Sequence, residues 1–236
     1  MHIDREWSIS FDEQRYISAQ GESFLRLLKN PDLLGTFQEA LTEIKQLIDP
    51  IACWDCFPIR EICREKLVLA DGTEVDDGTV VSALNGASKL AVAICTIGSA
   101  ADARIEMYQA NKELFKAAIL SDLAAWGVDM VRQQLCLRLE ENFRQEGLKV
   151  SAPLSPGESK WSIRDQKVIF TLLDASQIKV SLNESMVMSP AKSLSLIMGM
   201  GTQLAMVEGA THCDFCTMRK RCLRWRLQPN VEPSTV

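Results

Sequence analysis

Apolar residues recur at helical spacing in two parts of the chain. Between residues 22 and 48 they fall three or four positions apart, and Pro31 interrupts the pattern, so we expect two helices there. A longer seam follows a turn at Gly98–Ser99 and predicts the longest helical region of the chain, which ends at Gly147. The main positions of this seam are Ile119, Leu123, Gly127, Val131, Leu135, Leu139 and Phe143.

Other segments carry the patterns of strands. Residues 67–69 form a short apolar run before a turn at Asp71–Gly72, and residues 89–97 form a continuous apolar run that predicts a strand buried on both faces. Apolar and polar residues alternate at 178–183 and again at 194–198, which predicts two further strands. Because the strands are few, separated and mixed with helices, we predict an α+β fold. We expect a twisted mixed or antiparallel sheet flanked by helices and preceded by an N-terminal helical segment.

Two shorter helices complete the expected organisation. One covers residues 77–85 and ends at a glycine. The other follows a loop over residues 151–161, which is rich in Ser, Pro and Gly. Ser162 followed by Asp165 resembles a capping box, so we expect the second helix to begin there and to continue to about Leu173.

Composition and charge narrow the class of protein. The chain has 236 residues, of which 47% are hydrophobic and 24% charged, as in ordinary globular proteins. A net charge of −5 and the lack of a long basic stripe argue against nucleic-acid binding. No apolar run reaches the roughly 18 residues that would span a membrane. The polar N-terminus carries no apolar signal core, so we expect a cytoplasmic protein whose thiols stay reduced.

Histidine chemistry is nearly excluded. The sequence contains only His2, at the terminus, and His212, which adjoins a cysteine. Neither is placed for acid–base work or for a nucleophilic triad, so no catalytic residue is assigned.

A cysteine trio near the C-terminus is the first candidate metal site. Cys213, Cys216 and Cys222 have the spacing C-x2-C-x5-C, which is common to zinc and to iron–sulfur sites. Both kinds of site usually take four ligands, so the fourth ligand is left open. An iron–sulfur cluster is the first interpretation, zinc the alternative, and a metal-free tail the third.

A second trio, Cys53, Cys56 and Cys63, is a weaker candidate. Each trio could hold its own metal, or the two could share ligands around one site. For Cys53, Cys56 and Cys63 the absence of a metal is the first interpretation. The remaining cysteines, Cys95 and Cys136, lie in apolar surroundings and are expected to be core thiols.

The stretch LSPGESKWSIRDQKVIFTLLDASQIKVSLNESMVMSPAKSLSLIMG resembles the activation domain of cobalamin-dependent methionine synthase. It is more similar still to the free-standing proteins built on that domain, several of which have a cysteine-rich tail. The matching motifs are a Pro-Gly loop, a helix ending in Leu-Leu-Asp, a Glu-Ser pair and a Ser-x-Ser strand, in the same order. Upstream, AVAICTIGSAADARI and the long helix containing Asp129 are also similar, so the resemblance covers roughly residues 58–201.

The resemblance implies a chemistry. The activation domain binds S-adenosylmethionine, and with an external electron donor it supports the reductive methylation of inactive cob(II)alamin. The chemistry belongs to the two cofactors, while the protein supplies positioning. For this chain the resemblance implies a stand-alone reactivator that acts on a corrinoid protein or a cobalamin-dependent methyltransferase. An iron–sulfur cluster in the tail would supply electrons to the cobalt.

The resemblance also implies a set of ligand-binding residues. The loop Ser155-Pro156-Gly157 would lie against S-adenosylmethionine, since Pro-Gly lets the backbone approach a ligand. The Asp129 carboxylate would suit the cationic amine or sulfonium of that ligand. The family's Glu-Ser pair corresponds to Glu184 and Ser185.

Two positions depart from the family pattern. The arginine that would grip the ligand carboxylate is Pro153 here, and the tyrosine after Pro-Gly is Glu158. The arginine's function could be taken over by another arginine such as Arg164, or ligand binding could be altered or lost. The alternative function is therefore a corrinoid-protein-binding or iron–sulfur electron-transfer module that does not bind S-adenosylmethionine.

These interpretations divide the chain into three segments. Residues 1–57 are expected to be an N-terminal helical extension, and residues 58–205 an α+β core like the activation domain. Residues 206–236 are expected to be a cysteine-rich tail with a possible metal site.

Overall fold

The computed structural model of the protein describes residues 1–158, 161–204, 213 and 219–228. Its centre is an antiparallel sheet in the order β4-β3-β2-β5-β9-β6, with β1 paired to β2. A separate hairpin is formed by β7 and β8. The strands are β1 His2–Asp4, β2 Ile51–Ile62, β3 Leu67–Leu69, β4 Glu74–Val75, β5 Lys89–Thr96, β6 Lys149–Val150, β7 Ser181–Leu182, β8 Met188–Ser189 and β9 Ser193–Gly201.

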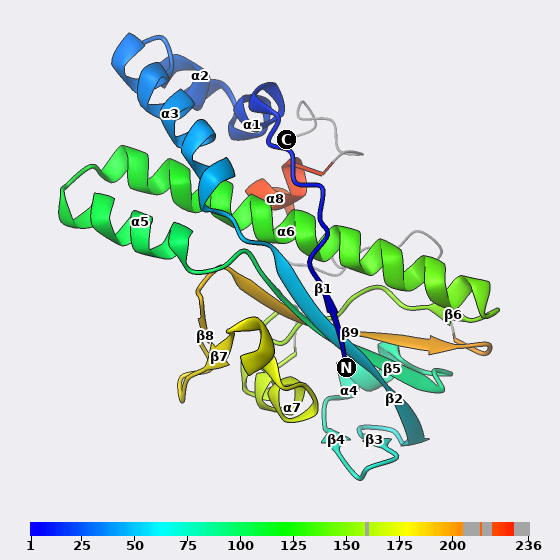
Figure 1. The fold of residues 1–236 in the computed structure, drawn as a ribbon. Coiled ribbons are helices and arrows are strands. Elements are labelled where there is room, and N and C mark those ends of the chain that lie inside the picture. Colours follow the sequence, from blue (N-terminus) through cyan, green and yellow to red (C-terminus); the bar gives the residue numbers. More distant parts are fainter. Residues whose placement is uncertain (159–160, 205–212, 214–218, 229–236) are drawn as a thin grey trace.

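Helices flank this sheet, and the α+β fold class is confirmed. In Figure 1, α3, α5 and α6 cover one face, while α7 and the β7–β8 hairpin lie on the other side. The α-helices are α1 Glu13–Gln20, α2 Glu22–Leu27, α3 Pro31–Leu47, α4 Gly78–Ala83, α5 Ala100–Ala110, α6 Leu114–Gln145, α7 Gln166–Leu172 and α8 Leu223–Arg226. Short 3-10 turns are η1 Ile163–Asp165, η2 Ala175–Ile178 and η4 Arg219–Arg221.

The helix boundaries follow local sequence signals. Pro31 separates α2 from α3 and occupies the first turn of α3, while the Asn30 side chain accepts a hydrogen bond from the Asp32 N–H and caps that helix. The Ser162 hydroxyl accepts from the Arg164 N–H and starts η1, which α7 then continues. The helices expected at 22–48, at 77–85 and from Ser162 are thus confirmed.

Strand β5 lies in the middle of the sheet and is buried on both faces, as its sequence indicated. Its alternate residues Ala91, Ala93 and Cys95 pack on the side of α6, and Leu90, Val92 and Ile94 pack on the opposite side. The small side chains on the first face let a long helix lie close to the sheet. That helix, α6, has 32 residues and carries Asp129.

One expected strand is wrong over most of its length. Within residues 178–183 only Ser181–Leu182 is a strand, because Lys179 adopts a left-handed backbone conformation with φ of 57° after the turn η2. The Val180 N–H donates to the Ala175 carbonyl at 3.0 Å, and this turn buries both Ile178 and Val180. The apolar alternation therefore came from a turn and not from an extended chain.

The N-terminal part of the chain contributes to the sheet. Strand β2 crosses residue 57, and residues on both sides of that position pair with β5. Strand β1 pairs with β2 through the register Ile3 to Cys53. None of the described helices is long and apolar enough to cross a membrane.

The described part of the C-terminal tail docks on the helical layer. Helix α8 lies against α1 and α6, and the Leu227 side chain is buried in the core beside them. The Arg15 Nε–H donates to the Leu227 carbonyl oxygen at 2.6 Å and fixes this contact. The described part of the tail thereby contacts α6, the helix that carries the candidate site.

Candidate functional site

A buried ion pair on α6 forms the centre of the candidate site. Arg132 Nη2 donates to Asp129 Oδ1 at 2.6 Å, and Gln133 Nε2 donates to Asp129 Oδ2 at 2.8 Å. The side chains of Arg132 and Asp129 are 2% and 1% exposed. Both oxygens of Asp129 therefore have a partner on its own helix.

The carboxylate of Asp129 stabilises the charged form of Arg132. Burial alone would lower the pKa of Arg132, but the carboxylates of Asp129 and Glu158 raise that pKa above its usual range. The guanidinium is therefore charged at any physiological pH. A buried charge of this kind is stable only beside its counter-charge, because desolvation of an unpaired ion is costly.

The loop predicted to bind a ligand leaves the sheet edge close to this pair. Leu154 forms an isolated antiparallel bridge with Ile197 of β9, with N–O distances of 2.9 and 2.8 Å. Ser155 and Pro156 follow and are buried. Glu158 Oε1 then lies 3.9 Å from Arg132 Nη1, so the loop and α6 meet at the buried guanidinium.

The left-handed backbone at position 157 favours glycine. Its φ is 87°, and a Cβ placed there would lie 2.8 Å from the Cδ1 atom of Ile163. The turn is closed by the Gly157 N–H donating to the Trp161 carbonyl at 3.0 Å. Trp161 is buried and donates from Nε1 to Asp165 Oδ2 at 2.7 Å, which anchors the loop to the start of α7.

Two buried polar atoms, one in this loop and one at the start of α7, have no hydrogen-bond partner among the described residues. They are the Ser155 hydroxyl oxygen and Gln166 Oε1, in side chains that are 7% and 4% exposed. Gln166 uses only its Nε2, which donates to the Met186 carbonyl at 3.3 Å. Buried polar groups are nearly always satisfied in folded proteins, so two orphans here indicate a place for a ligand or water.

Glu184 and Ser185 lie in the exposed turn of the β7–β8 hairpin. The Asn183 side chain shapes this turn by accepting from the N–H groups of Ser185 and Val187, both at 2.9 Å. Among the described residues, no hydrogen bond or ion pair joins Glu184 or Ser185 to the Ser155 loop or to Asp129. The link is indirect, because the next residue, Met186, accepts from Gln166.

The structure does not bring Cys53, Cys56 and Cys63 together. Cys53 and Cys56 belong to β2, where they pack into the cores on opposite faces of the sheet, as strand alternation requires. Cys63 lies beyond the strand, exposed, and donates from Sγ to Glu61 at 2.9 Å. The described residues contain no group of three potential ligands. The described structure therefore does not support a metal held by these three thiols together.

The tail trio is described only in part. Cys216 lies outside the described residues, while Cys213 is buried and its Sγ accepts from Gln228 Nε2 at 3.3 Å. Burial raises the pKa of the Cys213 thiol to about 11; Arg132 lowers it, and both Asp129 and Cys222 raise it. At a pKa of about 11 this thiol is neutral at physiological pH.

Cys95 is buried in the core, as expected, and Cys136 is partly buried and packs against that core. Burial raises the pKa of both, that of Cys136 to about 12, and the charge of Arg132 acts on each in the opposite direction. Neutral at physiological pH, they do not compete with Asp129 for the guanidinium.

Sequence reasoning missed Arg132. The alternative that it named, Arg164, is exposed at the start of α7. A signal was available, because Asp129 and Arg132 are three positions apart inside the apolar seam, where two charges can be buried only as a pair. The spacing could not show that the loop at 155–158 would reach the same point.

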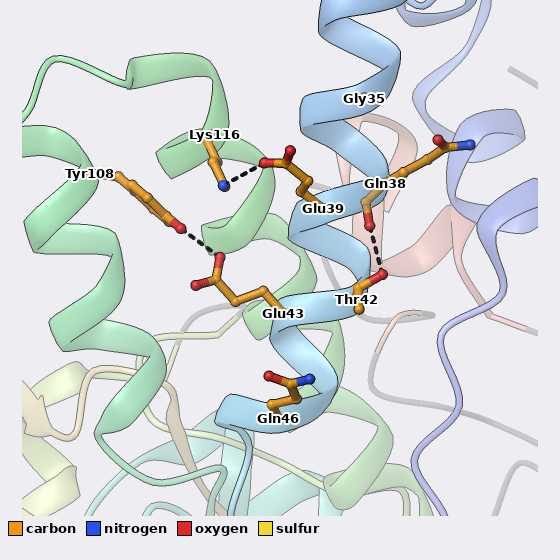
Figure 2. A pocket seen from close by; sticks show the side chains of 8 residues that line it. All are labelled: Gly35, Gln38, Glu39, Thr42, Glu43, Gln46, Tyr108 and Lys116. Atoms are coloured by element: carbon orange, nitrogen blue, oxygen red, sulfur yellow. Dashed lines mark hydrogen bonds and ion pairs between the residues drawn. The ribbon is translucent and has the colours of Figure 1, made fainter.

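Two solvent-open hollows among the described residues lie elsewhere. Figure 2 shows the larger, about 640 Å³, between α3 and the α5–α6 hairpin. Its charges are already paired, with Lys116 to Glu39 at 2.8 Å and the Tyr108 hydroxyl donating to Glu43 at 2.7 Å. The second, about 430 Å³, is lined by residues including Asp4, Trp54 and Arg138.

We predict that Asp129→Asn strongly destabilises the protein. Arg132 would keep its charge in a buried position with a neutral neighbour, and breaking a buried pair typically costs about 3–5 kcal/mol. Urea unfolding followed by circular dichroism measures the change. Glu22→Gln is the control, since it breaks the exposed Glu22–Arg26 pair and should leave the midpoint unchanged. Equal midpoints for wild type and Asp129→Asn would contradict this account of the ion pair.

A comparison with solved structures finds a domain with the same fold. The chain is similar to the crystal structure of the MetH reactivation domain bound to AdoHcy, with a TM-score of 0.57 and 13% sequence identity. The alignment covers 86% of this chain and 79% of the other. The chain matches no protein-family model and no curated protein sequence. The protein therefore shares the overall fold of the MetH reactivation domain.

Proposed function

We propose that the protein is a stand-alone reactivator of a corrinoid- or cobalamin-dependent methyltransferase. It would support the S-adenosylmethionine-dependent reductive methylation of cob(II)alamin carried by a partner protein. The observation that carries this proposal is the fold shared with a reactivation domain whose crystal structure is bound to AdoHcy. The order of motifs along the sequence supports it independently.

The proposed reaction needs one electron and one methyl group. An external donor reduces Co(II) to Co(I) by one electron. The Co(I) electron pair then attacks the sulfonium methyl, which leaves S-adenosylhomocysteine and a methyl–Co(III) product. The reaction requires that the two cofactors approach in a fixed orientation, which is what a binding protein can supply.

Residues of the loop and of α7 have polar groups that suit the binding of the methyl donor. The Ser155 hydroxyl and Gln166 Oε1 are buried and unsatisfied, so each can hydrogen-bond a ligand without giving up an existing partner. At Gly157 the exposed backbone permits close approach of a ligand. Glu184 and Ser185, exposed in the neighbouring hairpin, remain proposed ligand contacts.

Asp129 has a different role in this proposal from the one that the resemblance implied. Both of its oxygens already accept hydrogen bonds, from Arg132 and Gln133. Its negative charge still acts on the site, but its first effect is to hold the Arg132 guanidinium in place.

The hydrogen bonds that already occupy both Asp129 oxygens favour a second candidate function. If the engaged Asp129 and the changed positions Pro153 and Glu158 prevent ligand binding, the chain is a module that binds or reduces a corrinoid protein. In this form the tail residues Cys213, Cys216 and Cys222 would hold an iron–sulfur cluster or, alternatively, zinc. The C-x2-C-x5-C spacing of these cysteines supports a common site, and thiol ligands suit either metal.

The proposed segments follow these roles. Residues 58–205 would bind the methyl donor, residues 206–236 would carry the metal, and residues 1–57 would complete the helical layer and the sheet.

Anaerobic purification followed by metal and sulfide analysis tests the tail. We expect iron and acid-labile sulfide, with a visible absorbance band that is lost when Cys213 and Cys222 are both changed to Ser. Zinc without sulfide would select the alternative metal. A protein free of both would overturn the proposal of a metal tail.

Reactivation can be measured directly. The protein is mixed with a cob(II)alamin-loaded methyltransferase, S-adenosylmethionine and a low-potential reductant under anaerobic conditions. We expect the visible spectrum of the corrinoid to change to that of the methylated form, at a rate that depends on the protein. No acceleration over the mixture without the protein would rule out the reactivator function.

Ser155→Ala separates ligand binding from folding. Because the buried hydroxyl has no partner, its removal should leave the unfolding midpoint unchanged or slightly higher. Its loss should weaken AdoHcy binding about fivefold to tenfold, the effect of one hydrogen bond, as measured by calorimetry. Ser193→Ala is the matched control, since its hydroxyl donates to the Pro190 carbonyl at 2.7 Å. It should lower stability and leave the affinity unchanged, and the reverse pattern would contradict this assignment.

A further inference from the structure

Arg132 faces two carboxylates, of which one is fixed by hydrogen bonds and the other is not. Asp129 lies one turn away on the same helix, at 2.6 Å, and its second oxygen is fixed by Gln133. Glu158 comes from a loop and lies 3.9 Å away, beyond hydrogen-bond distance. Its side chain is 23% exposed, against 1% for Asp129. Asp129 is thus a permanent partner, whereas Glu158 is held only by charge and has access to solvent.

We propose that Glu158 occupies the place at Arg132 that a ligand's carboxylate takes, and that it leaves when the ligand binds. Arg132 would then be the carboxylate-binding residue and Glu158 an internal competitor. The inference rests on the proposed binding of an S-adenosyl amino acid. It adds that Arg132 recognises the amino-acid end of the ligand and that Glu158 limits the affinity for the ligand.

Because of the charges at the site, a ligand carboxylate has to replace the Glu158 carboxylate and cannot bind beside it. Among the described residues, the guanidinium already faces two carboxylates, and the thiols of Cys95, Cys136 and Cys213 have raised pKa values and add no positive charge. A third carboxylate would meet strong repulsion at a buried position. A ligand carboxylate therefore binds only if Glu158 moves away.

The loop is built so that only the Glu158 side chain has to move. The Glu158 N–H donates to the Ser155 carbonyl at 3.1 Å, and its carbonyl accepts from the Trp161 N–H at 3.2 Å. These backbone bonds hold the turn, while the carboxylate of Glu158 has no hydrogen bond to any described residue. Rotation of its side chain into solvent would remove the Glu158 carboxylate from the side of Arg132 that faces the loop. The unsatisfied Ser155 hydroxyl belongs to the same loop.

The replacement gains directional hydrogen bonds that Glu158 lacks. A guanidinium binds a carboxylate best through parallel N–H···O bonds at about 2.7–2.9 Å, and these are stronger than a distant ion pair. A ligand that carries a carboxylate can make them, whereas Glu158 at its present distance does not. Ligands that share the nucleoside but lack the carboxylate gain nothing from Glu158 leaving.

Calorimetry on the full-length protein tests the inference with two ligands. AdoHcy carries the amino-acid carboxylate, and 5′-methylthioadenosine has the same nucleoside and thioether without it. We expect Glu158→Gln to bind AdoHcy about tenfold more tightly than wild type and 5′-methylthioadenosine with unchanged affinity. Glu106→Gln on the exposed side of α5 removes the same charge elsewhere and should change neither affinity.

A second variant tests Arg132 without deleting its charge. In the Glu158→Gln background, Arg132→Lys keeps a cation beside Asp129 but removes the fork that binds a carboxylate. We expect AdoHcy binding to weaken at least tenfold, with little change for 5′-methylthioadenosine. Circular dichroism melting confirms that the variant is folded. If it is not folded, the comparison of wild type with Glu158→Gln still decides the question.

The outcomes separate this inference from the proposed function. If wild type binds AdoHcy and Glu158→Gln binds it no more tightly, the exchange is wrong while the reactivator function stands. An equal gain for both ligands would also overturn it, since the effect would then not concern the carboxylate. Binding by Glu158→Gln alone would support the exchange. Absence of AdoHcy binding in both proteins would overturn the ligand-binding function and the exchange with it.

Discussion

The buried ion pair between Arg132 and Asp129 is the interaction on which the candidate site depends. A guanidinium in the protein interior needs a fixed counter-charge, and Asp129 supplies it from one turn away on the same helix. This leaves the other side of Arg132 to meet the loop at Glu158 and to act on the thiol of Cys213 in the tail. Three segments far apart in sequence are thereby organised around one charge.

The sheet makes this arrangement possible by placing a long helix close to its centre. Ala91, Ala93 and Cys95 of β5 are small on the face that α6 covers, so the helix that carries Arg132 can pack closely there. The same alternation along β2 sends Cys53 and Cys56 to opposite faces of the sheet. Strand geometry thus separates Cys53 from Cys56 and does not support a metal held by the first three cysteines.

A common fold at 13% identity does not carry the chemistry of the site with it. Backbone architecture survives extensive substitution as long as apolar patterning is kept, whereas recognition of a ligand depends on a few polar atoms. Here the loop has Pro153 and Glu158 where the resembled family has an arginine and a tyrosine. The buried cation near the loop comes instead from α6. The proposed function therefore rests on the fold, and the proposed ligand contacts on residues of this chain.

The sequence by itself determined the α+β class, the buried strand at 89–97, the long helix and the loop at 151–161, because these depend on periodicity and turn chemistry that are local to each segment. It could not show that the alternation at 178–183 belongs to a turn, since Ile178 and Val180 are buried together only by the left-handed residue between them. Nor could it pair Glu158 with Arg132 or separate Cys53 from Cys56. Those outcomes follow from which faces of helix, loop and strand meet, and only tertiary packing decides that.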